Sequence, residues 1–395
     1  MKIALIGNMN NNFFATARML WDRGYDAHVF VPDTTPEHFM PEADTFEPLD
    51  SKRVHFISWD HPFNIFKTPK EEIQQALAGF DFYIGHGCAP AYLQKAGITL
   101  DVFVPYGSDM YRYAYYKLTR PQNIIQYTYF AWLQRKGLRA TKHLHLEPSH
   151  KLEVIAEDIG CKGEIHFLGC PSVYPAVPDS FGKSPFYQQV KALKEGTDLL
   201  IFHHSRHYWK TQGDPAANKG NDLFIRALSR FVKSHQDVSV KVVTFEYGDD
   251  VDASKSLIQE EGLAEIFHWF PKMHRRDIIA GLSLADLGAQ QFRRPYLCFG
   301  TVLECLSVGV PVMYKRSVGE SGHREEDLFE MYNVDSEETI YSALVEFSQD
   351  IEGNKARLGE SGRNWFLKHN VNDPIDLYIR LAEQKVQQEK HESAR

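Results

Sequence analysis

The sequence predicts an α/β protein with two Rossmann-like lobes, each a doubly wound parallel sheet, that face a cleft. Short apolar runs ending in glycine or polar turns alternate with segments whose apolar residues recur at helical spacing. This alternation occurs twice, and a proline-rich stretch separates the two series. A length of 395 residues leaves room for two domains, since single cores rarely grow beyond roughly 250–300 residues.

The first series opens with a βαβ pattern. An apolar run at 2–7 precedes a helical pattern at 13–23, Gly24 stands where that helix would end, and a second apolar run covers 27–31. Further strands are expected at 54–57, 82–84, 102–104 and 164–168, with helices at 71–77 and 152–159. Doubly wound sheets bind ligands beyond the carboxyl ends of their strands, so the turns after these strands are candidate sites.

The second series follows a segment with Pro171, Pro175, Pro178 and Pro185, which indicates a linker. Strands are expected at 198–203, 239–245, 266–269, 287–290 and 310–314, and helices at 220–231, 254–261, 275–285 and 300–307. We therefore expect a first domain over 1–175, a linker over 176–196 and a second domain over 197–370. Residues 371–395 are expected to form a helix that packs back on the first domain, followed by a polar tail.

Composition argues against several classes of protein. Five cysteines fall at no metal-ligand spacing, and their odd number suits no complete disulfide framework, so we expect reduced thiols. The opening residues lack the apolar core of a secretory signal, and no run of about 18–20 apolar residues occurs, which predicts a cytoplasmic protein. The net charge of −8 argues against nucleic acid as a partner.

The most informative motif lies in the second domain. Phe299, Gly300 and Thr301 open an apolar helix that carries a carboxylate, Glu304, and ends at Gly309. The free N–H groups of such a helix would face the carboxyl edge of the sheet and favour an anion through oriented donors and the helix dipole. From spacing alone, an ordinary helix with a solvent-facing glutamate is the alternative.

Two cations precede this helix in the same domain. Arg206 follows the strand at 198–203, and Lys219 comes directly before the Gly220 that opens the next helix. Arginine offers a planar fork of donors and lysine a compact charge, which together suit a diphosphate whose negative charge grows as it departs. Taken singly, each could instead be a structural or surface cation.

These motifs resemble the donor site of the retaining GT-B-fold glycosyltransferases of the group 1 family. The resemblance implies that Glu304 holds the nucleotide ribose, that Arg206 and Lys219 hold the diphosphate, and that the amides at 299–301 meet the donor sugar and phosphate. It also implies a UDP- or GDP-linked sugar as co-substrate, with no metal and no other cofactor. Accordingly, the acidic run at 249–252 is not interpreted as a metal site.

Two positions bear on the nature of the donor. Phe270 ends a strand where the family's base-binding loop falls, although an aromatic residue there could equally belong to the core. Tyr296 stands where the family usually has a second glutamate, eight residues before Glu304, so the donor sugar stays open.

In the first domain, polar residues follow three expected strands. Gly7 and Asn8, with Asn10 in the same loop, resemble the family's glycine-containing first turn, which approaches donor phosphate and acceptor. His86 follows the strand at 82–84 and could face the cleft or be structural. The turn after 102–104, Tyr106, Gly107, Ser108 and Asp109, resembles a family turn that usually begins with histidine, and we expect it to bind the acceptor. Asp109 and His86 are also catalytic candidates.

A basic and aromatic segment follows this turn. Residues 110–146 contain no Asp or Glu but hold seven cations (Arg112, Lys117, Arg120, Arg135, Lys136, Arg139 and Lys142) and eight aromatic residues (Tyr111, Tyr113, Tyr115, Tyr116, Tyr127, Tyr129, Phe130 and Trp132). Such a mixture suits an anionic membrane surface or a lipid-linked acceptor. The alternative is that the rings are core and the cations a solvated face.

The sequence thus predicts a cytoplasmic glycosyltransferase that acts in polysaccharide biosynthesis. If the basic and aromatic segment binds lipid, the enzyme would be peripheral at the inner membrane face. It would move a sugar from a nucleotide sugar to a glycan, lipid-linked or other hydroxyl acceptor. Two alternatives stay open: a nucleotide-sugar 2-epimerase, which needs cleft acids and bases that the sequence does not reveal, and a non-catalytic sugar-nucleotide-binding protein.

Overall fold

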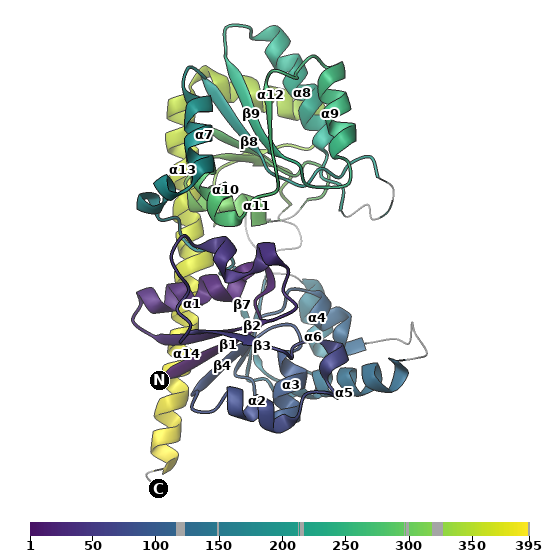
Figure 1. Cartoon of the computed structure of the whole chain (residues 1–395), viewed down its shortest axis with the longest axis vertical. Helices are drawn as coiled ribbons and strands as arrows, with labels where there is room; N and C mark the ends of the chain where they lie inside the picture. Colours follow the sequence, from purple (N-terminus) through teal and green to yellow (C-terminus); the bar gives the residue numbers. More distant parts are fainter. Residues whose placement is uncertain are drawn as a thin grey trace. The chain divides into compact units, whose positions relative to one another are not determined.

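The computed structural model describes residues 1–115, 123–147, 150–211, 213, 217–295, 297, 300–317 and 327–393. The chain divides into two compact units (Figure 1). The first unit contains Met1–Tyr174 and Lys368–Arg395, and the second contains most of residues 175–367. Each unit is built around a parallel sheet, which confirms the predicted fold class.

The sheet of the first unit has seven strands among the described residues, in the order β3-β2-β1-β4-β5-β6-β7. They are β1 (Lys2–Ile6), β2 (Asp26–Pro32), β3 (Val54–Ile57), β4 (Phe82–Gly85), β5 (Val102–Phe103), β6 (His143–Leu146) and β7 (Glu164–Phe167). The helices are α1 (Asn12–Asp22), α2 (Lys70–Ala76), α3 (Ala89–Ala96), α4 (Ser108–Tyr111), α5 (Ile124–Ala140), α6 (His150–Ile159) and α14 (Asp373–Ser393). Strand order reverses between β1 and β4, which makes that pair the switch point of the sheet.

Close packing of helices supports this sheet. Gly137 of α5 lies against α3, and a Cβ atom there would come within 2.1 Å of the carbonyl oxygen of Pro90. Larger side chains, including Trp59, Tyr92 and Phe130, fill one core. Full burial of each such side chain contributes about 1.5–3 kcal/mol.

The C-terminal helix α14 belongs to the first unit and packs on its sheet. The hydroxyl of Tyr378 lies 2.6 Å from His145 Nδ1 on β6. Lys385 Nζ donates to Asp101 Oδ2 at 2.8 Å, and Arg23 pairs with Asp376 at 2.7 Å. Residues that are distant in sequence therefore hold the helix in place.

The second unit repeats the architecture with the order β10-β9-β8-β11-β12-β13. Its described strands are β8 (Leu199–His203), β9 (Val240–Phe245), β10 (Phe267–Phe270), β11 (Leu287–Ala289), β12 (Val312–Tyr314) and β13 (Tyr332–Asn333). The helices are α7 (Pro185–Lys194), α8 (Asn221–Ser234), α9 (Val251–Glu260), α10 (Arg275–Leu282), α11 (Gly300–Ser307), α12 (Glu337–Gln349) and α13 (Ile351–Phe366). The switch point here lies between β8 and β11.

The expected linker at 176–196 is instead helical and part of the second unit. Pro185 is the first residue of α7, where its missing N–H costs nothing, and the Ser184 hydroxyl caps the helix by accepting from Tyr187 N. Phe186 packs where Gly281 of α10 leaves space, since a Cβ there would lie 2.4 Å from its ring. Two of the four prolines that indicate a linker, Pro178 and Pro185, are thus the first residues of helices.

Among the described residues, no helix combines the length and apolarity that a membrane span requires.

Candidate functional site

The switch point of the second sheet gathers polar side chains from two neighbouring strands. His204, Ser205 and Arg206 follow β8, and Gln290 and Gln291 follow β11. Because β8 and β11 are adjacent and parallel, their carboxyl ends place these residues at one edge of the sheet. This is where open α/β sheets bind ligands.

Glu304 of α11 is held at this edge by two side chains. Its Oε2 lies 3.1 Å from His204 Nε2, and its Oε1 accepts from Arg275 Nε at 2.9 Å. Burial alone would raise the pKa of Glu304, but hydrogen bonds from His204 and Arg275 outweigh it and lower the pKa below its ordinary value. The buried carboxylate is therefore ionised at neutral pH.

Gln290 fixes which ring nitrogen of His204 donates to Glu304. Its Nε2 amide donates to His204 Nδ1 at 3.0 Å, which leaves the imidazole proton on Nε2, facing Glu304. The Oε1 of Gln290 accepts from the Ser205 hydroxyl at 2.9 Å. A continuous chain of hydrogen bonds thus runs Ser205–Gln290–His204–Glu304–Arg275.

Lys219 reaches the same edge from the loop before α8. Its Nζ donates to Gln291 Oε1 at 2.8 Å, and its backbone pairs with Tyr208 and Phe292. Gly220, at φ 71°, makes the left-handed turn into α8, and a Cβ there would lie 2.9 Å from Arg293 Cγ. Lys219 and Glu304 therefore connect to consecutive glutamines at the end of β11.

Arg206 lies two residues after His204. Its guanidinium is 5.5 Å from the ring centroid of Tyr208, and within the described part of the chain no carboxylate forms an ion pair with it. Gly248 lets a neighbouring loop pass close, since a Cβ there would be 2.8 Å from Arg206 Cγ. Arg206, Lys219 and Glu304 thus share the switch-point edge.

The amino end of α11 lies beside Glu304. Gly300 is exposed, and the Thr301 hydroxyl is buried with no hydrogen-bond partner among the described residues. Phe299, Tyr296 and Cys298 lie outside the described residues, as do Tyr116, Lys117 and Arg120 of the basic segment.

Phe270 is placed in an aromatic cluster of the second unit. Its ring packs edge-on against Phe186 at 4.8 Å and lies 6.3 Å from Phe245. Trp269, the preceding residue, packs instead against His207 at 4.8 Å. Phe270 is half-buried, so packing accounts for one side of its ring.

Within the acidic run at 249–252, Asp250 binds the backbone of a loop. Both carboxylate oxygens of Asp250 accept from the backbone of Trp209, Lys210 and Thr211 at 2.6–3.2 Å. Burial raises the pKa of Asp250, yet these hydrogen bonds and the Thr211 hydroxyl outweigh it and lower the pKa overall. Asp250 therefore holds the segment between Arg206 and Lys219.

In the first unit, Gly7, Asn8 and His86 meet at the switch point of β1 and β4. Gly7, at φ 100°, leaves room for the His86 ring, which a Cβ would approach to 2.4 Å. Met9 N donates to His86 Nε2 at 3.0 Å, so the proton resides on Nδ1, which is buried without a partner among the described residues. Burial lowers the pKa of His86 to about 3.

The first turn itself is held by Asn8. Its Oδ1 accepts from Phe14 N at 3.0 Å, and its Nδ2 donates to Asn11 Oδ1 at 2.7 Å. Asn10 is exposed and adopts the left-handed conformation at φ 50°. Asn8 is therefore a turn residue, whereas Asn10 lies at the surface.

Asp109 is fully buried and binds backbone amides. Its oxygens accept from the N–H groups of Gly87, Tyr106, Gly107 and Met110 at 3.0–3.2 Å. Burial raises the pKa of Asp109 to about 7, against the opposing effect of these hydrogen bonds. Asp109 joins the turns that follow β4 and β5.

The other residues of this turn are half-buried. The Tyr106 ring stands edge-on to His86 at 5.4 Å, Ser108 begins α4, and Gly107 takes a φ of 110°. The turn thus presents Tyr106, Gly107 and Ser108 beside His86, while Asp109 lies beneath them.

Sequence reasoning missed four residues of the second site: His204, Arg275, Gln290 and Gln291. Three of them directly follow a strand at the carboxyl edge, the same signal that singled out Arg206. Arg275 opens α10, and only its contact with Glu304 marks it.

Comparisons with known proteins identify the fold. No family model matches the chain, and no curated protein sequence does. Solved structures do: a glycosyltransferase from Rickettsia africae has a TM-score of 0.61 at 15% identity over 98% of both chains. Anabaena Alr3699/HepE with UDP and glucose has 0.58 at 13% identity, over 99% of this chain and 100% of that one. Sucrose-phosphate synthase from Thermosynechococcus elongatus has 0.56 at 13%, over 100% and 99%.

These neighbours are glycosyltransferases of the GT-B fold, and the likeness extends over nearly the whole chain. The protein described here therefore has the GT-B fold.

Proposed function

We propose that this protein is a glycosyltransferase that binds a nucleotide-diphosphate sugar at the switch-point edge of its second unit. One observation carries the proposal. Lys219 donates to Gln291 at the end of β11, Glu304 is linked to the adjacent Gln290 through His204, and Arg206 follows the neighbouring strand β8. Two cations and an ionised carboxylate at such an edge match the two ends of a nucleoside diphosphate.

Each group has a distinct task in this proposal. Arg206 and Lys219 stabilise the charge that accumulates on the departing diphosphate. Glu304 keeps lone pairs beyond those used by His204 and Arg275, because a carboxylate offers about four acceptor sites, and ribose hydroxyls would donate to them. The unpartnered Thr301 hydroxyl and the amides that begin α11 would meet the donor sugar and phosphate.

UDP is the first nucleotide to test. Crystal structures of Anabaena Alr3699/HepE contain UDP, UDP with glucose, and UDP-glucose. We propose retention of the anomeric configuration without a metal, as the sequence resemblance implies. The leaving phosphate would then accept the proton of the acceptor hydroxyl.

The acceptor is assigned to the first unit. Tyr106, Gly107 and Ser108 present half-buried polar groups beside His86, and Asn10 is exposed in the first turn. Because His86 Nε2 accepts from Met9 N, its free group is the Nδ1–H donor. We therefore propose that His86 orients a bound hydroxyl, a role that a buried neutral imidazole can perform.

The basic and aromatic segment supports a membrane-borne acceptor. Of its rings, Phe130 is buried in the core, whereas Trp132 is 48% and Tyr111 49% exposed. Ile125 of α5 is 76% exposed, and Lys136 Nζ lies 5.1 Å from the Trp132 ring. Exposed apolar side chains beside cations suit the face of an anionic bilayer.

The experiment that tests the proposal is a binding screen followed by turnover. UDP should raise the melting temperature more than GDP, ADP or CMP. Arg206→Ala and Lys219→Ala should each reduce turnover by about 10²–10³-fold, the typical effect of removing one charge-stabilising donor. Lys233→Ala is the control, since that exposed lysine pairs only with Glu261 at 3.7 Å among the described residues. Near-normal activity in both variants would reject the site.

A 2-epimerase is the second candidate, because a Listeria monocytogenes protein assigned as a UDP-N-acetylglucosamine 2-epimerase shares the fold at a TM-score of 0.50. Incubation with a UDP-sugar and no acceptor separates the two enzymes. An epimerised nucleotide sugar would identify the isomerase. Saturable UDP binding without turnover on any acceptor would instead indicate a non-catalytic binding protein.

A further inference from the structure

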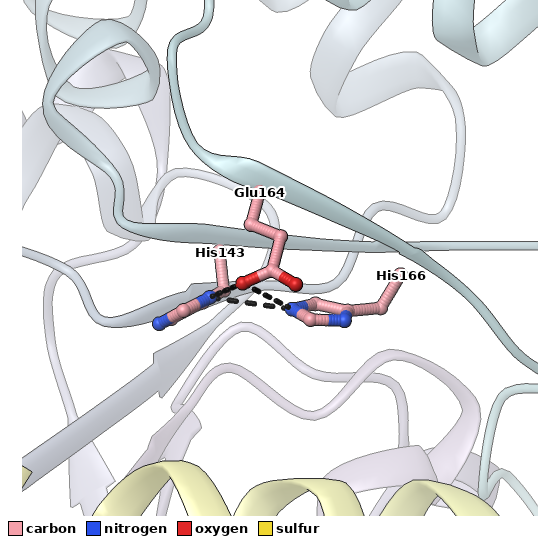
Figure 2. A group of neighbouring side chains, drawn as sticks. All are labelled: His143, Glu164 and His166. Carbon is pink, nitrogen blue, oxygen red and sulfur yellow. Dashed lines mark hydrogen bonds and ion pairs between the residues drawn. The ribbon is translucent and has the colours of Figure 1, made fainter. Parts of the chain in front are cut away.

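Two histidines and a glutamate gather on the last two strands of the first sheet. Figure 2 shows His143 of β6 and Glu164 and His166 of β7 with their polar atoms turned toward one another. His143 Nδ1 and His166 Nε2 are 3.2 Å apart. Glu164 Oε2 lies 3.6 Å from the first nitrogen and 3.8 Å from the second.

These separations fit one small cation between the three atoms. Zinc binds imidazole nitrogen at about 2.0–2.1 Å, so two ligands of a tetrahedral site lie about 3.3–3.4 Å apart. The two nitrogens already have this separation. The Glu164 side chain is 68% exposed, so a small rotation would bring its oxygen closer.

Sheet register brings the three residues together. His143 is opposite Glu164 and His145 is opposite His166 in the parallel β6–β7 pair. Side chains two residues apart share a face of a strand, so Glu164 and His166 lie on the same side of β7. The backbone therefore sets the ligand geometry before any ion arrives.

A second histidine pair in the same unit shows the contrast. His28 Nδ1 and His55 Nε2 are hydrogen-bonded at 2.8 Å, which is well short of the ligand spacing of a tetrahedral zinc site, whereas the 3.2 Å hydrogen bond between His143 and His166 is close to it. Asp26 contacts the other nitrogen of His28, at 3.1 Å, so these three residues form a chain rather than a cage. Only the His143 group encloses a common point among the described residues.

We propose that His143, Glu164 and His166 bind a divalent transition cation of the zinc type, with water completing the coordination. A hollow of about 370 Å³, lined in part by His166, Asp376 and Arg380, opens beside the site and gives solvent access. Two cations lie near the site: Lys142, which shares the carboxylate of Asp101 with Lys385, and Arg380 of α14, which lines the same hollow as His166.

A cation bound here would stabilise the pairing of the edge strand β7 with β6. β7 is the last strand of its sheet and pairs only with β6 among the described strands. His143 and Glu164 begin their strands, so the cation lies toward the amino ends, whereas His86 and Asp109 follow the carboxyl ends. The cation therefore fastens β7 to β6 and takes no part in sugar transfer.

Cobalt and zinc binding to the chelator-treated full chain tests this site. We expect one Co²⁺ per chain with the visible absorption of a low-symmetry site, displaced by Zn²⁺. Both His143→Ala and His166→Ala should abolish it, and Glu164→Gln should weaken it. At a zinc concentration 100 times the dissociation constant, opening of β7 should become about 100-fold rarer, measured by hydrogen exchange of its amides.

His55→Asn is the matched control and should keep full metal binding, because Asp26 contacts the far nitrogen of His28 and the three do not converge on one point. If a histidine variant fails to fold, Glu164→Gln carries the test, since its side chain is largely exposed. Absence of saturable binding in the wild-type chain would overturn the proposal, as would unchanged binding in the folded variants. Unchanged hydrogen exchange of the β7 amides with zinc bound would overturn the role of the cation in stabilising that strand.

Discussion

The carboxyl edges of the two sheets share a topology but use their buried polar side chains differently. In the first unit, Asp109 binds four backbone N–H groups, and Gln134 binds the backbone of Gly87, Ala91 and Asp109. In the second unit, Glu304, His204 and Gln290 bind one another. At the switch point of the first sheet polar side chains fasten backbone turns, whereas at that of the second sheet they bind one another; Asp250, which follows β9, fastens a loop as Asp109 does.

This difference shows why strand order alone does not locate a ligand. Strand order reverses in both sheets at an equivalent pair, β1–β4 and β8–β11. Side chains that are saturated by backbone amides have a fixed structural task, since breaking those contacts leaves buried donors unpaired. Side chains that contact other side chains can share their acceptor sites with a ligand, so the second edge is the better donor site.

Acidification gives the largest contrast between the units. In the second unit, burial lowers the pKa of His203 to about 4 and of His207 to about 2. Stability from such neutral histidines is lost as pH falls below about 6.5, because the unfolded chain then takes up the protons. At pH 5 the two histidines together cost about 4 kcal/mol. The lowered pKa of Glu304 acts in the same direction below about pH 4.5.

The first unit should lose less stability on acidification, because the pKa shifts of its buried groups have opposite effects. The pKa values of His86, about 3, and His145, about 4, give the same loss on acidification. The pKa of Asp109, raised to about 7, contributes stability that is lost as pH rises through 7 and regained as pH falls. Burial also raises the pKa of Asp60 well above its ordinary value, which acts in the same direction as Asp109, so the net loss at pH 5 should be clearly smaller than in the second unit. Hydrogen exchange of β8 and β1 amides at pH 7.5 and 5, corrected for intrinsic rates, measures this; a greater loss at β1 would contradict it.

Asp109→Ala should destabilise the first unit by about 3 kcal/mol, because several buried backbone N–H groups lose their acceptor. Asp109→Asn keeps one oxygen and should cost about half of that. Urea unfolding measures both, with the exposed Asp33→Ala as control. UDP affinity of the folded variant should be unchanged; a drop in affinity without a drop in stability would assign Asp109 to the ligand instead.

The sequence was sufficient to predict the two sheets and the residues that follow their central strands. Glu304 and Lys219 could be selected because a carboxylate in an apolar helix and a Lys-Gly before a helix are local patterns. The contact between Gln290 and His204 joins residues 86 apart, and only the pairing of β8 with β11 creates it. A local pattern therefore indicates which residues are candidates, and sheet register decides which of them meet.

Two errors have the same origin. The strand β6 was not expected, because two histidines in its four residues, His143 and His145, lower its apolar character; α14 and β7 give them partners. The sequence predicts a linker where α7 lies, because proline is common both in loops and in first helical turns. In each case contacts distant in sequence determine the structure.

Glu304→Gln tests whether the hydrogen bonds from Ser205 to Arg275 can rearrange around a neutral side chain. The glutamine amide would face His204, whose proton can move to Nδ1 if Gln290 turns its amide over and Ser205 accepts from it. The hydrogen bonds can therefore be kept, but Arg275 loses its carboxylate partner, so stability should fall by about 1–3 kcal/mol. Loss of a charged acceptor for ribose should weaken UDP binding by about 2 kcal/mol, roughly 30-fold. Calorimetric titration with UDP and with inorganic pyrophosphate distinguishes the ribose contact, since pyrophosphate binding should be unaffected. Equal loss for both ligands would place Glu304 at the phosphates.

The smallest expected effect concerns the surface of the first unit. Lys136 lies over the exposed Trp132, while Arg139 Nε donates to the Ile159 carbonyl oxygen at 2.6 Å and Lys142 pairs with Asp101. Of these three cations, Lys136 is therefore the one that can meet a bilayer without loss of internal contacts. Trp132→Ala with Lys136→Ala should weaken partition to phosphatidylserine vesicles by about tenfold, since a cation near an anionic surface contributes about 1 kcal/mol and the ring adds apolar contact. The matched surface change Lys233→Ala in the second unit should have no effect; if it weakens partition equally, the attraction is a property of overall charge and the two units do not differ in this respect.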